Sequence, residues 1–175
     1  MKIIVISDTH GRADNVDTVI NMHKNADVLL FLGDGLRDMF GREHLHRGGV
    51  FAAVKGNCDE VSLFNTSDIP DEHLINLGEY TVLMMHGHKY GVKYGTEAAV
   101  ERAAMLGADL LLYGHTHVPE ERYIPDGARV GGVVLEKPLR VFNPGSLGAP
   151  RDRYPSYGLI DTKGKNILLS HGKIK

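Results

Sequence analysis

The 175-residue sequence lacks several features that mark particular classes of protein. Its single cysteine, Cys58, excludes a disulfide within one chain and is typical of proteins kept in a reducing cytoplasm. The chain has no tryptophan, so it offers no indole on which a nucleobase could stack. No apolar stretch approaches the roughly 20 residues of a membrane span, and the short run after Met1 is too brief for a signal-peptide core. We therefore expect a soluble, cytoplasmic protein.

An excess of charge of one sign is also missing. Twenty basic and 22 acidic residues give a formal net charge of −2. This balance argues against a broad nucleic-acid-binding surface, because such a surface is strongly basic. It stays compatible with a small phosphorylated substrate held by metal ions. The hydrophobic content of 42% is ordinary for a soluble globular protein, and the length predicts one domain over residues 1–175.

Short apolar runs alternate with helical patterns in the first third of the chain. The runs are typical of strands buried on both faces, and they cover residues 2–8, 26–34 and 49–57. Between the first two, residues 13–25 place Val16, Val19 and Ile20 at helical spacing, and residues 35–45 predict a short helix. This alternation indicates an α/β fold with parallel strands.

The rest of the chain adds one clear helix and many strands. Residues 72–87 predict a hairpin that turns at Leu77-Gly78-Glu79. Residues 95–107 predict a helix capped by Thr96 and ended by Gly107. The further expected strands cover residues 108–115, 118–124, 129–136, 139–146 and 157–174, the last with a hairpin turn at 162–165. Two sheets stacked between helices accommodate this order.

Polar side chains that can bind metals follow five of the expected strands. In open α/β sheets the ligand crevice lies outside the carboxyl ends of the strands, so these side chains should meet. The donors are Asp8, His10, Asp34, Asn57, His86, His115 and His117. Taken singly, each histidine has an alternative interpretation as a hydrogen-bonded turn residue. Each aspartate has an alternative interpretation as a helix N-cap. The agreement of five strand ends favours a metal site.

Seven donors are too many for one ion that keeps positions open for a substrate. Two ions bridged by a carboxylate can use them, and paired metals about 3.5–4 Å apart are a recurrent device for phosphoester cleavage. The mixed nitrogen and oxygen donors suit Mn, Fe, Co, Ni or Zn better than Ca or Mg.

The order of the motifs D-x-H, GD, GN, H and GHxH resembles that of the calcineurin-like metallophosphoesterase superfamily. The segments "SDTHG", "GNCD", "HGH", "GHTH" and "NPGSLGAPR" are most similar to its YfcE-like phosphodiesterase branch, and the motifs span residues 7–151. The resemblance implies a four-layer α/β/β/α sandwich of two mixed β-sheets flanked by helices. It also implies two divalent transition-metal ions, manganese first among Mn, Ni, Co, Fe and Zn. One ion would be held by Asp8, His10, Asp34 and His117, and the other by Asp34, Asn57, His86 and His115, with Asp34 as the bridge.

One position departs from the pattern of many superfamily members. Cys58 replaces a histidine that serves there as a general acid or contacts the phosphate. The departure argues against a protein-phosphatase-like mechanism, whereas the phosphodiesterase branch often has cysteine at this position. We expect Cys58 to be a small packed residue and His88 to contact the phosphate or protonate the leaving oxygen. Arg151 is a weaker candidate for anion binding, and Asp59 is either a support for a neighbour or a solvated residue.

The implied activity is hydrolysis of a phosphodiester by attack of a metal-bridging hydroxide, with His88, Asn57 and Asp34 as the catalytic residues. One alternative is a non-catalytic, metal-binding scaffold for protein interactions of the Vps29 type; the seven filled ligand positions favour the enzyme. Another is a phosphomonoesterase. The expected partner is a small phosphodiester substrate, with homo-oligomers possible through β-edges within residues 123–136. The other histidines are expected to be structural, namely His23, His44, His46, His73 and His171.

Overall fold

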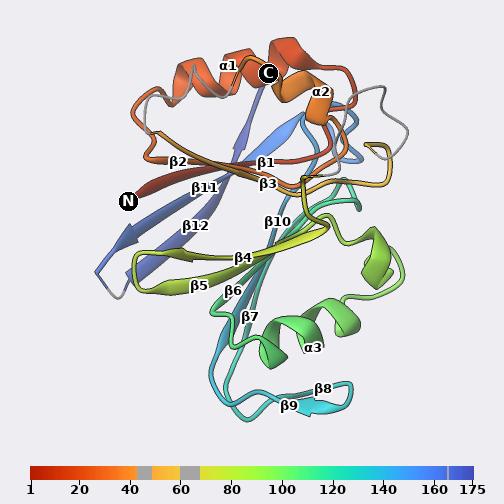
Figure 1. Cartoon of the computed structure of the whole chain (residues 1–175), viewed down its shortest axis with the longest axis vertical. Helices are drawn as coiled ribbons and strands as arrows, with labels where there is room; N and C mark the ends of the chain where they lie inside the picture. Colours follow the sequence, from red (N-terminus) through yellow and green to blue (C-terminus); the bar gives the residue numbers. More distant parts are fainter. Residues whose placement is uncertain (43–48, 60–67, 165) are drawn as a thin grey trace.

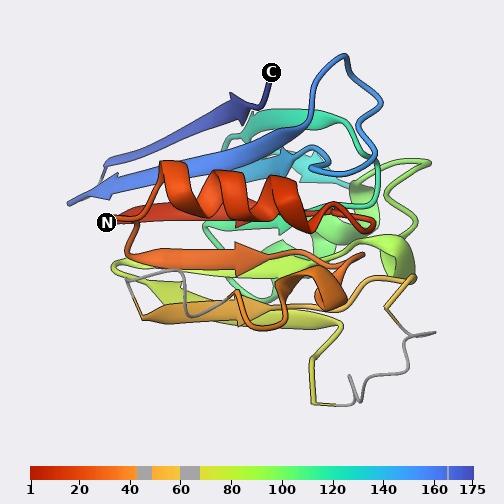
Figure 2. The same cartoon turned by 90° about the horizontal axis from the view of Figure 1, so that it is seen from above.

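The computed structural model describes residues 1–42, 49–59, 68–164 and 166–175. Two five-stranded sheets face each other, and helices cover their outer faces (Figures 1 and 2). The first sheet has the order β12 (Asn166–Lys173), β11 (Ser156–Lys163), β1 (Lys2–Ile6), β2 (Val28–Phe31) and β3 (Val50–Ala53). The second has the order β4 (Glu72–Leu77), β5 (Tyr80–Met85), β6 (Leu110–Tyr113), β10 (Leu139–Pro144) and β7 (Pro119–Ile124).

The helices complete the four layers. α1 (Ala13–Met22) and α2 (Leu36–Met39) lie on the first sheet, and α3 (Glu97–Met105) lies on the second (Figure 1). A 3-10 turn, η2 (His88–Tyr90), follows β5, and a small ribbon of β8 (Arg129–Val130) and β9 (Val133–Val134) lies beyond α3. The α/β/β/α sandwich expected from the sequence is confirmed. None of the described helices is long and apolar enough to cross a membrane.

The second sheet has a parallel centre and an antiparallel strand at each edge, whereas the first sheet is parallel as far as its β3 edge and antiparallel at its β12 edge. β1, β2 and β3 pair in parallel, as do β5, β6 and β10, whereas β11, β12, β4 and β7 join antiparallel. Parallel neighbours need a crossover connection, which α1 provides between β1 and β2 and α3 provides between β5 and β6. The carboxyl ends of the parallel strands therefore collect at one edge of each sheet, and the polar loops follow there.

The alternation of side chains along β1 explains its unbroken apolar run. Ile3 and Val5 point into the core between the two sheets, while Ile4 and Ile6 point toward α1. Because both faces of the strand are covered, every position from 3 to 6 is apolar and buried. A third apolar layer packs α3 against the outer face of the second sheet.

Several local predictions need correction. The helix expected over 13–25 ends at Met22. Of the helix expected over 35–45, the described part of the chain forms only α2. The strand expected over 129–136 is split into β8 and β9, because the chain turns at Gly131 with φ 54°. Thr96 precedes α3 but its hydroxyl accepts a hydrogen bond from Arg122 at 2.5 Å and does not cap the helix.

Other local predictions are confirmed. The hairpin of β4 and β5 turns at Gly78, which has φ 63° and which joins the paired residues Leu77 and Tyr80. Gly107 follows α3 with φ 64°, a left-handed conformation that ends the helix. The turn expected at 162–165 joins β11 to β12, although its last residue lies outside the described part of the chain.

Candidate metal centre

The loops after four strands bring six of the seven predicted ligands to one place, and the seventh, Asn57, follows a fifth strand. β1 leads to Asp8 and His10, β2 to Asp34, β3 to Asn57, β5 to His86, and β6 to His115 and His117. Ligand atoms that lie within 4.8 Å of one another form three groups among the described residues: Asp8, His10 and His117; Asp34, His86 and His115; and His10, Asp34 and Cys58. The first group contains three of the four ligands expected for one ion, and the second contains three of the four expected for the other.

The first group is built on a fully buried aspartate. Asp8 Oδ1 lies 3.2 Å from His117 Nε2 and 3.9 Å from His10 Nε2. The two imidazole Nε2 atoms are 3.2 Å apart. Three donor atoms of types that transition metals prefer therefore converge on one point.

The second group is built on Asp34. Its Oδ2 lies 3.3 Å from His86 Nε2, which in turn is 3.1 Å from His115 Nδ1. The same Oδ2 lies 3.9 Å from His10 Nε2, which belongs to the first group. The other oxygen of Asp34 accepts a hydrogen bond from the backbone N–H of Cys58 at 2.7 Å. Oδ2 of Asp34 thus links the two groups, and Oδ1 of Asp8 does so from the other side, 3.9 Å from His86 Nε2.

One oxygen of Asp8 gives an independent test of whether a cation fits. The side chain is fully buried, and Oδ2 accepts hydrogen bonds from Ser7 Oγ at 2.5 Å and the His115 N–H at 3.0 Å. Oδ1 has no hydrogen-bond partner in the described structure and faces His117. A buried carboxylate oxygen without a partner is costly, and a bound cation would satisfy it. The donor set therefore fits a metal ion.

Backbone carbonyls orient two of the imidazoles. His86 Nδ1 lies 2.7 Å from the Leu32 carbonyl oxygen, and His117 Nδ1 lies 2.7 Å from that of Ala149. A carbonyl can only accept, so the proton of each neutral ring sits on Nδ1 and the Nε2 lone pair faces the carboxylates. This arrangement is the usual way in which proteins aim a histidine at a metal.

The pKa values of the histidines at this centre are shifted in different directions. Although burial opposes charging of His86, its hydrogen bond to Asp34 and the charge of Asp8 raise its pKa. The neighbouring carboxylate of Asp8 raises the pKa of His117, whereas burial and the neighbouring His86 lower the pKa of His115 to about 4. Burial opposes ionisation of Asp34, but the bond to His86 holds its pKa below the usual range. The centre is thus organised around the carboxylates of Asp8 and Asp34.

Backbone strain is concentrated at this centre. In the described part of the chain, five residues other than glycine have a positive φ: Asp8 (54°), His10 (43°), Asp34 (59°), His115 (67°) and His117 (60°). All five are predicted metal ligands. The left-handed region is unfavourable for residues with a Cβ, and surrounding structure has to impose it.

Asp59 is the residue that imposes this conformation on the Asp34 loop. It is 4% exposed, and its carboxylate accepts hydrogen bonds from the backbone N–H groups of Asp34 (2.8 Å), Gly35 (2.9 Å), Leu36 (2.9 Å) and Gly56 (2.8 Å). Four donors on one carboxylate tie the loop after β2 to the loop after β3. Of the two roles left open by the sequence, the supporting role is correct.

Replacing Asp59 by Asn should lower the free energy of unfolding by about 1–3 kcal/mol, because an amide nitrogen would face backbone donors and leave them unsatisfied. Urea unfolding of the metal-free protein measures the change. Asp126→Asn, at an exposed turn, is the matched control and should change stability by less than about 0.5 kcal/mol. Equal stability of the two variants would contradict the supporting role of Asp59.

Three further polar residues hold the ligand loops, and sequence reasoning did not single them out. Buried Asn143 donates from Nδ2 to the Gly114 carbonyl at 3.1 Å and to Thr116 Oγ1 at 3.0 Å, which fixes the "GHTH" loop. Ser146 Oγ donates to the Asp8 carbonyl at 2.8 Å. Asn143 and Ser146 lie in the "NPGS" segment, and that polar cluster at a strand end was the available signal.

The third is Asp38, which lies in α2 four residues after Asp34. Its Oδ2 accepts hydrogen bonds from Thr9 Oγ1 at 2.5 Å and from the Gly11 N–H at 2.8 Å. It therefore brackets the loop residue His10. The side chain is 8% exposed, so these contacts are shielded from water.

Gly114 is required by close packing at the same point. A Cβ there would lie 2.0 Å from Ser7 Oγ and 2.8 Å from Asp8 Oδ2, although the backbone conformation of Gly114 is ordinary. Any side chain would displace the hydroxyl that holds Asp8. The glycine therefore allows the loops after β1 and β6 to touch.

Asn57 and Cys58 lie side by side on the turn after β3. Both are exposed, and the Asn57 amide donates to Cys58 Sγ at 3.4 Å. The expectation of a small packed cysteine is wrong: the turn points the thiol outward, within 4.8 Å of ligand atoms of His10 and Asp34. Partial burial and the hydrogen bond to Asp34 raise the pKa of the Cys58 thiol to about 11.

His88 and Arg151 border the cluster. The His88 ring, at the start of η2, has its centroid 5.4 Å from that of His86 and 6.1 Å from that of His115. Arg151 is exposed, and its backbone N–H donates to the His117 carbonyl at 3.2 Å. His88 is thus the histidine that stands next to the predicted ligands without being one of them.

Two of the other histidines have structural contacts, as expected. His23 Nε2 lies 2.8 Å from the Tyr157 hydroxyl. His171 Nε2 lies 2.8 Å from the Asn143 carbonyl, and its ring stacks on Phe142. His73 belongs to β4, whereas His44 and His46 lie outside the described residues.

Comparison with known proteins gives one consistent result. The model of the calcineurin-like phosphoesterase superfamily domain matches residues 1–165. The probable metallophosphoesterase YsnB of Bacillus subtilis is 32% identical over 163 residues, which is 91% of this chain and 83% of the relative. The phosphodiesterase YfcE of Escherichia coli K12 is 29% identical over 189 residues, 96% of this chain and 91% of the relative.

Solved structures share the fold. A predicted phosphoesterase from Streptococcus pneumoniae superposes with a TM-score of 0.75 at 24% identity, covering 98% of this chain and 88% of that one. Vps29 from Entamoeba histolytica, complexed with Zn²⁺, superposes with a TM-score of 0.66 at 20% identity, covering 99% of each chain. Because the family model matches residues 1–165, nearly the whole chain, this chain belongs to the calcineurin-like phosphoesterase superfamily.

Proposed function

We propose that this chain is a dinuclear metal-dependent phosphodiesterase that hydrolyses a small phosphodiester. The observation that carries the proposal is the pair of Asp/His groups linked by Oδ2 of Asp34, which lies 3.3 Å from His86 Nε2 and 3.9 Å from His10 Nε2. When bound, two divalent transition-metal ions, manganese first, would supply a water of lowered pKa and neutralise charge on the phosphoryl oxygens.

The division of labour follows the geometry. Asp8, His10 and His117 would hold one ion, and His86 and His115 the other. Asn57, on the turn after β3, would be a further ligand of the second ion by the family resemblance. Asp34 would serve both ions, since its Oδ2 belongs to both neighbourhoods. Because backbone carbonyls fix the rings of His86 and His117, those lone pairs are in place before a metal arrives.

His88 is the proposed residue for contact with the phosphate or for protonation of the leaving oxygen. Its ring stands beside those of His86 and His115, and the residue is partly exposed, although its two ring nitrogens are buried. Replacing His88 by Ala should reduce kcat about a hundredfold, the lower end for loss of an acid or base group, with both metal ions retained. His73→Ala, in β4, is the matched control and should leave kcat unchanged. Loss of metal in His88→Ala would make His88 a ligand or a structural residue.

Cleavage of diesters rather than monoesters is the favoured specificity. Cys58 stands where many superfamily members have a histidine, and its thiol is protonated at neutral pH because its pKa is about 11. The E. coli relative is named a phosphodiesterase. Relative rates on bis-para-nitrophenyl phosphate and para-nitrophenyl phosphate test this choice, and faster cleavage of the monoester would favour the phosphomonoesterase.

A second candidate is a metal-binding scaffold without catalysis. The superposition with Vps29 complexed with Zn²⁺ supports it, since that protein keeps a similar fold and binds a metal. Two metal ions per chain with no hydrolysis of either ester would favour the scaffold. The cytoplasmic location and the homo-oligomer stay predictions.

A further inference from the structure

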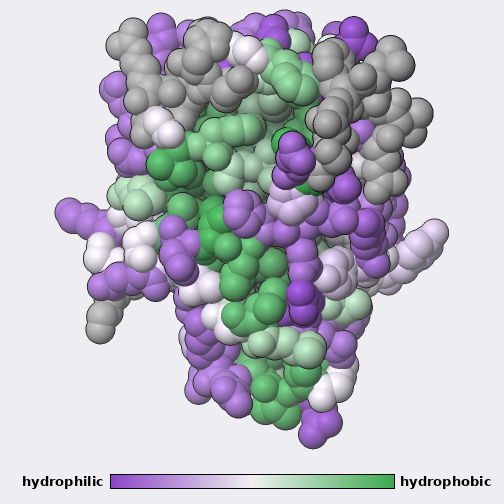
Figure 3. Space-filling model, in the orientation of Figure 1, coloured by the Kyte–Doolittle hydropathy of each residue, from purple (hydrophilic) through white to green (hydrophobic). Residues whose placement is uncertain are grey.

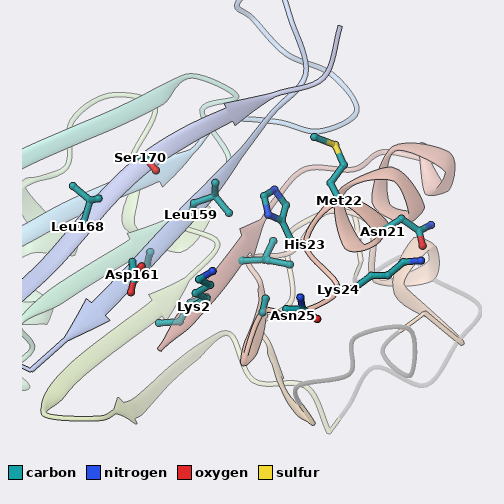
Figure 4. A pocket seen from close by; sticks show the side chains of 14 residues that line it. Lys2, Asn21, Met22, His23, Lys24, Asn25, Leu159, Asp161, Leu168 and Ser170 are labelled. Atoms are coloured by element: carbon teal, nitrogen blue, oxygen red, sulfur yellow. The ribbon is translucent and has the colours of Figure 1, made fainter.

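A hollow, called the second hollow below to distinguish it from the metal centre, lies on the helix-covered face of the first sheet. Its volume is about 630 Å³, within the range of small-molecule sites. Residues 21–26 at the end of α1, residues 2–4 of β1, and parts of β11 and β12 line it (Figure 4). None of the predicted metal ligands is among its lining residues.

The hollow exists because α1 covers only part of the sheet. In Figure 2 the helix lies over β1, while β11 and β12 extend to one side of it. Ile160 and Leu169 point into the core between the sheets, so Leu159 and Leu168 project to the outer face. Leu168 is 67% exposed, and Met22 at the end of the helix is 58% exposed. An apolar floor is therefore left open.

Positive charge stands at the edge of this floor. The Lys2 ammonium has no ion pair among the described residues, and neither has Lys24 at the rim. Asp161 lies opposite Lys2 in the register of β11 and β1. Its carboxylate, however, forms an ion pair at 3.9 Å with the amino terminus of Met1. Within the described lining, two lysines and one aspartate leave an excess of one positive charge.

The remaining titratable group of the hollow does not offset this charge. His23 faces the hollow next to Leu159 (Figure 4), and its ring is hydrogen-bonded to the Tyr157 hydroxyl. Burial and the nearby Lys2 lower the pKa of His23, so the ring is neutral at physiological pH. An incoming ligand thus meets an apolar floor bordered by Lys2 and Asp161, with one net positive charge in the described lining.

We propose that this hollow binds a small amphipathic anion, with its apolar body on Leu159 and Leu168 and its carboxylate or phosphate at Lys2. The site is separate from the metal centre. Lys2 begins β1 and Ile6 ends it, about 13 Å away at roughly 3.3 Å per residue, and Asp8 lies beyond that far end. The ligand is therefore not the substrate bound at the metals, and the proposal stands independently of the proposed activity.

The test is titration of the full-length chain with the fluorescent anion anilinonaphthalene sulfonate, followed by displacement with octyl phosphate. Saturable binding of one dye per chain and displacement by octyl phosphate are expected, with uncharged octyl glucoside displacing it at least about tenfold less well. Leu168→Asp, at an exposed position, should weaken dye binding about tenfold or more by placing a carboxylate on the floor. Lys2→Gln should weaken it severalfold.

The control is Met105→Asp, because Met105 is 72% exposed in a different apolar hollow beside α3 and β9. It should leave dye binding unchanged. Dye binding that depends on Met105 and not on Leu168 or Lys2 would overturn the proposal, as would equal displacement by octyl glucoside. Sedimentation with phosphatidylglycerol vesicles that Leu168→Asp abolishes, without displacement by octyl phosphate, would instead identify a membrane-binding surface and also overturn it.

Discussion

Replacement of Asp34 by Asn is expected to lower kcat/KM for bis-para-nitrophenyl phosphate by about a thousandfold or more. The Asp34 Oδ2 atom links the two ligand groups, so the variant loses the charge that serves both ions. A metal ion contributes several kcal/mol of transition-state stabilisation, and each 1.36 kcal/mol is tenfold in rate. The substitution is nearly isosteric, and the amide oxygen can still accept the Cys58 N–H bond that holds the loop.

The measurement pairs steady-state kinetics with metal analysis of the purified variant. Asp161→Asn, at an exposed position of β11, is the control and should retain the wild-type kcat/KM. If Asp34→Asn kept two ions per chain and more than a tenth of the activity, Asp34 would not be the shared ligand.

Replacement of Asp8 by Asn is expected to change activity and stability in opposite directions. Activity should fall by a similar factor, because Asp8 is the one carboxylate that the Asp8, His10 and His117 group has besides the shared Asp34. The metal-free variant should nevertheless be about 1–3 kcal/mol more stable than the metal-free wild type at about pH 8. The reason is that Oδ1 of the fully buried Asp8 has no hydrogen-bond partner without a cation.

Urea unfolding of both proteins after chelation measures the difference, and repeating it with metal should reverse the order. Bound metal stabilises the folded wild type by mass action, whereas the variant has lost that gain. A metal-free Asp8→Asn that is less stable than the metal-free wild type would show instead that Asp8 is a structural residue.

The fold was predictable because both faces of the central strands are covered. Runs such as residues 3–6 are apolar at every position, and each is followed by a polar loop at the carboxyl end of the strand. That rule alone brought together His10 and His117, which are 107 residues apart in the chain and have their Nε2 atoms 3.2 Å apart. The chemistry of the donors then indicated metal binding.

The supports of the site were not predictable, because no spacing encodes which backbone N–H groups a carboxylate accepts. Asp59 was left undecided, and Asp38 and Asn143 were not singled out, since their roles depend on loops packed against one another. The exposure of Cys58 depends on the same turn geometry. The early end of α1 at Met22, three residues before its pattern suggested, was not predictable either, and residues 23–26 beyond it line the second hollow.

The central claim is tested most directly by reloading the metal-free protein in turn with Mn, Ni, Co, Zn and Mg. Each form would be assayed on bis-para-nitrophenyl phosphate and on para-nitrophenyl phosphate, beside the variants Asn57→Ala and His86→Ala. We expect two ions per chain and metal-dependent cleavage of the diester that both variants lose. Two bound ions with no cleavage of either ester would contradict the phosphodiesterase and leave the chain a metal-binding scaffold.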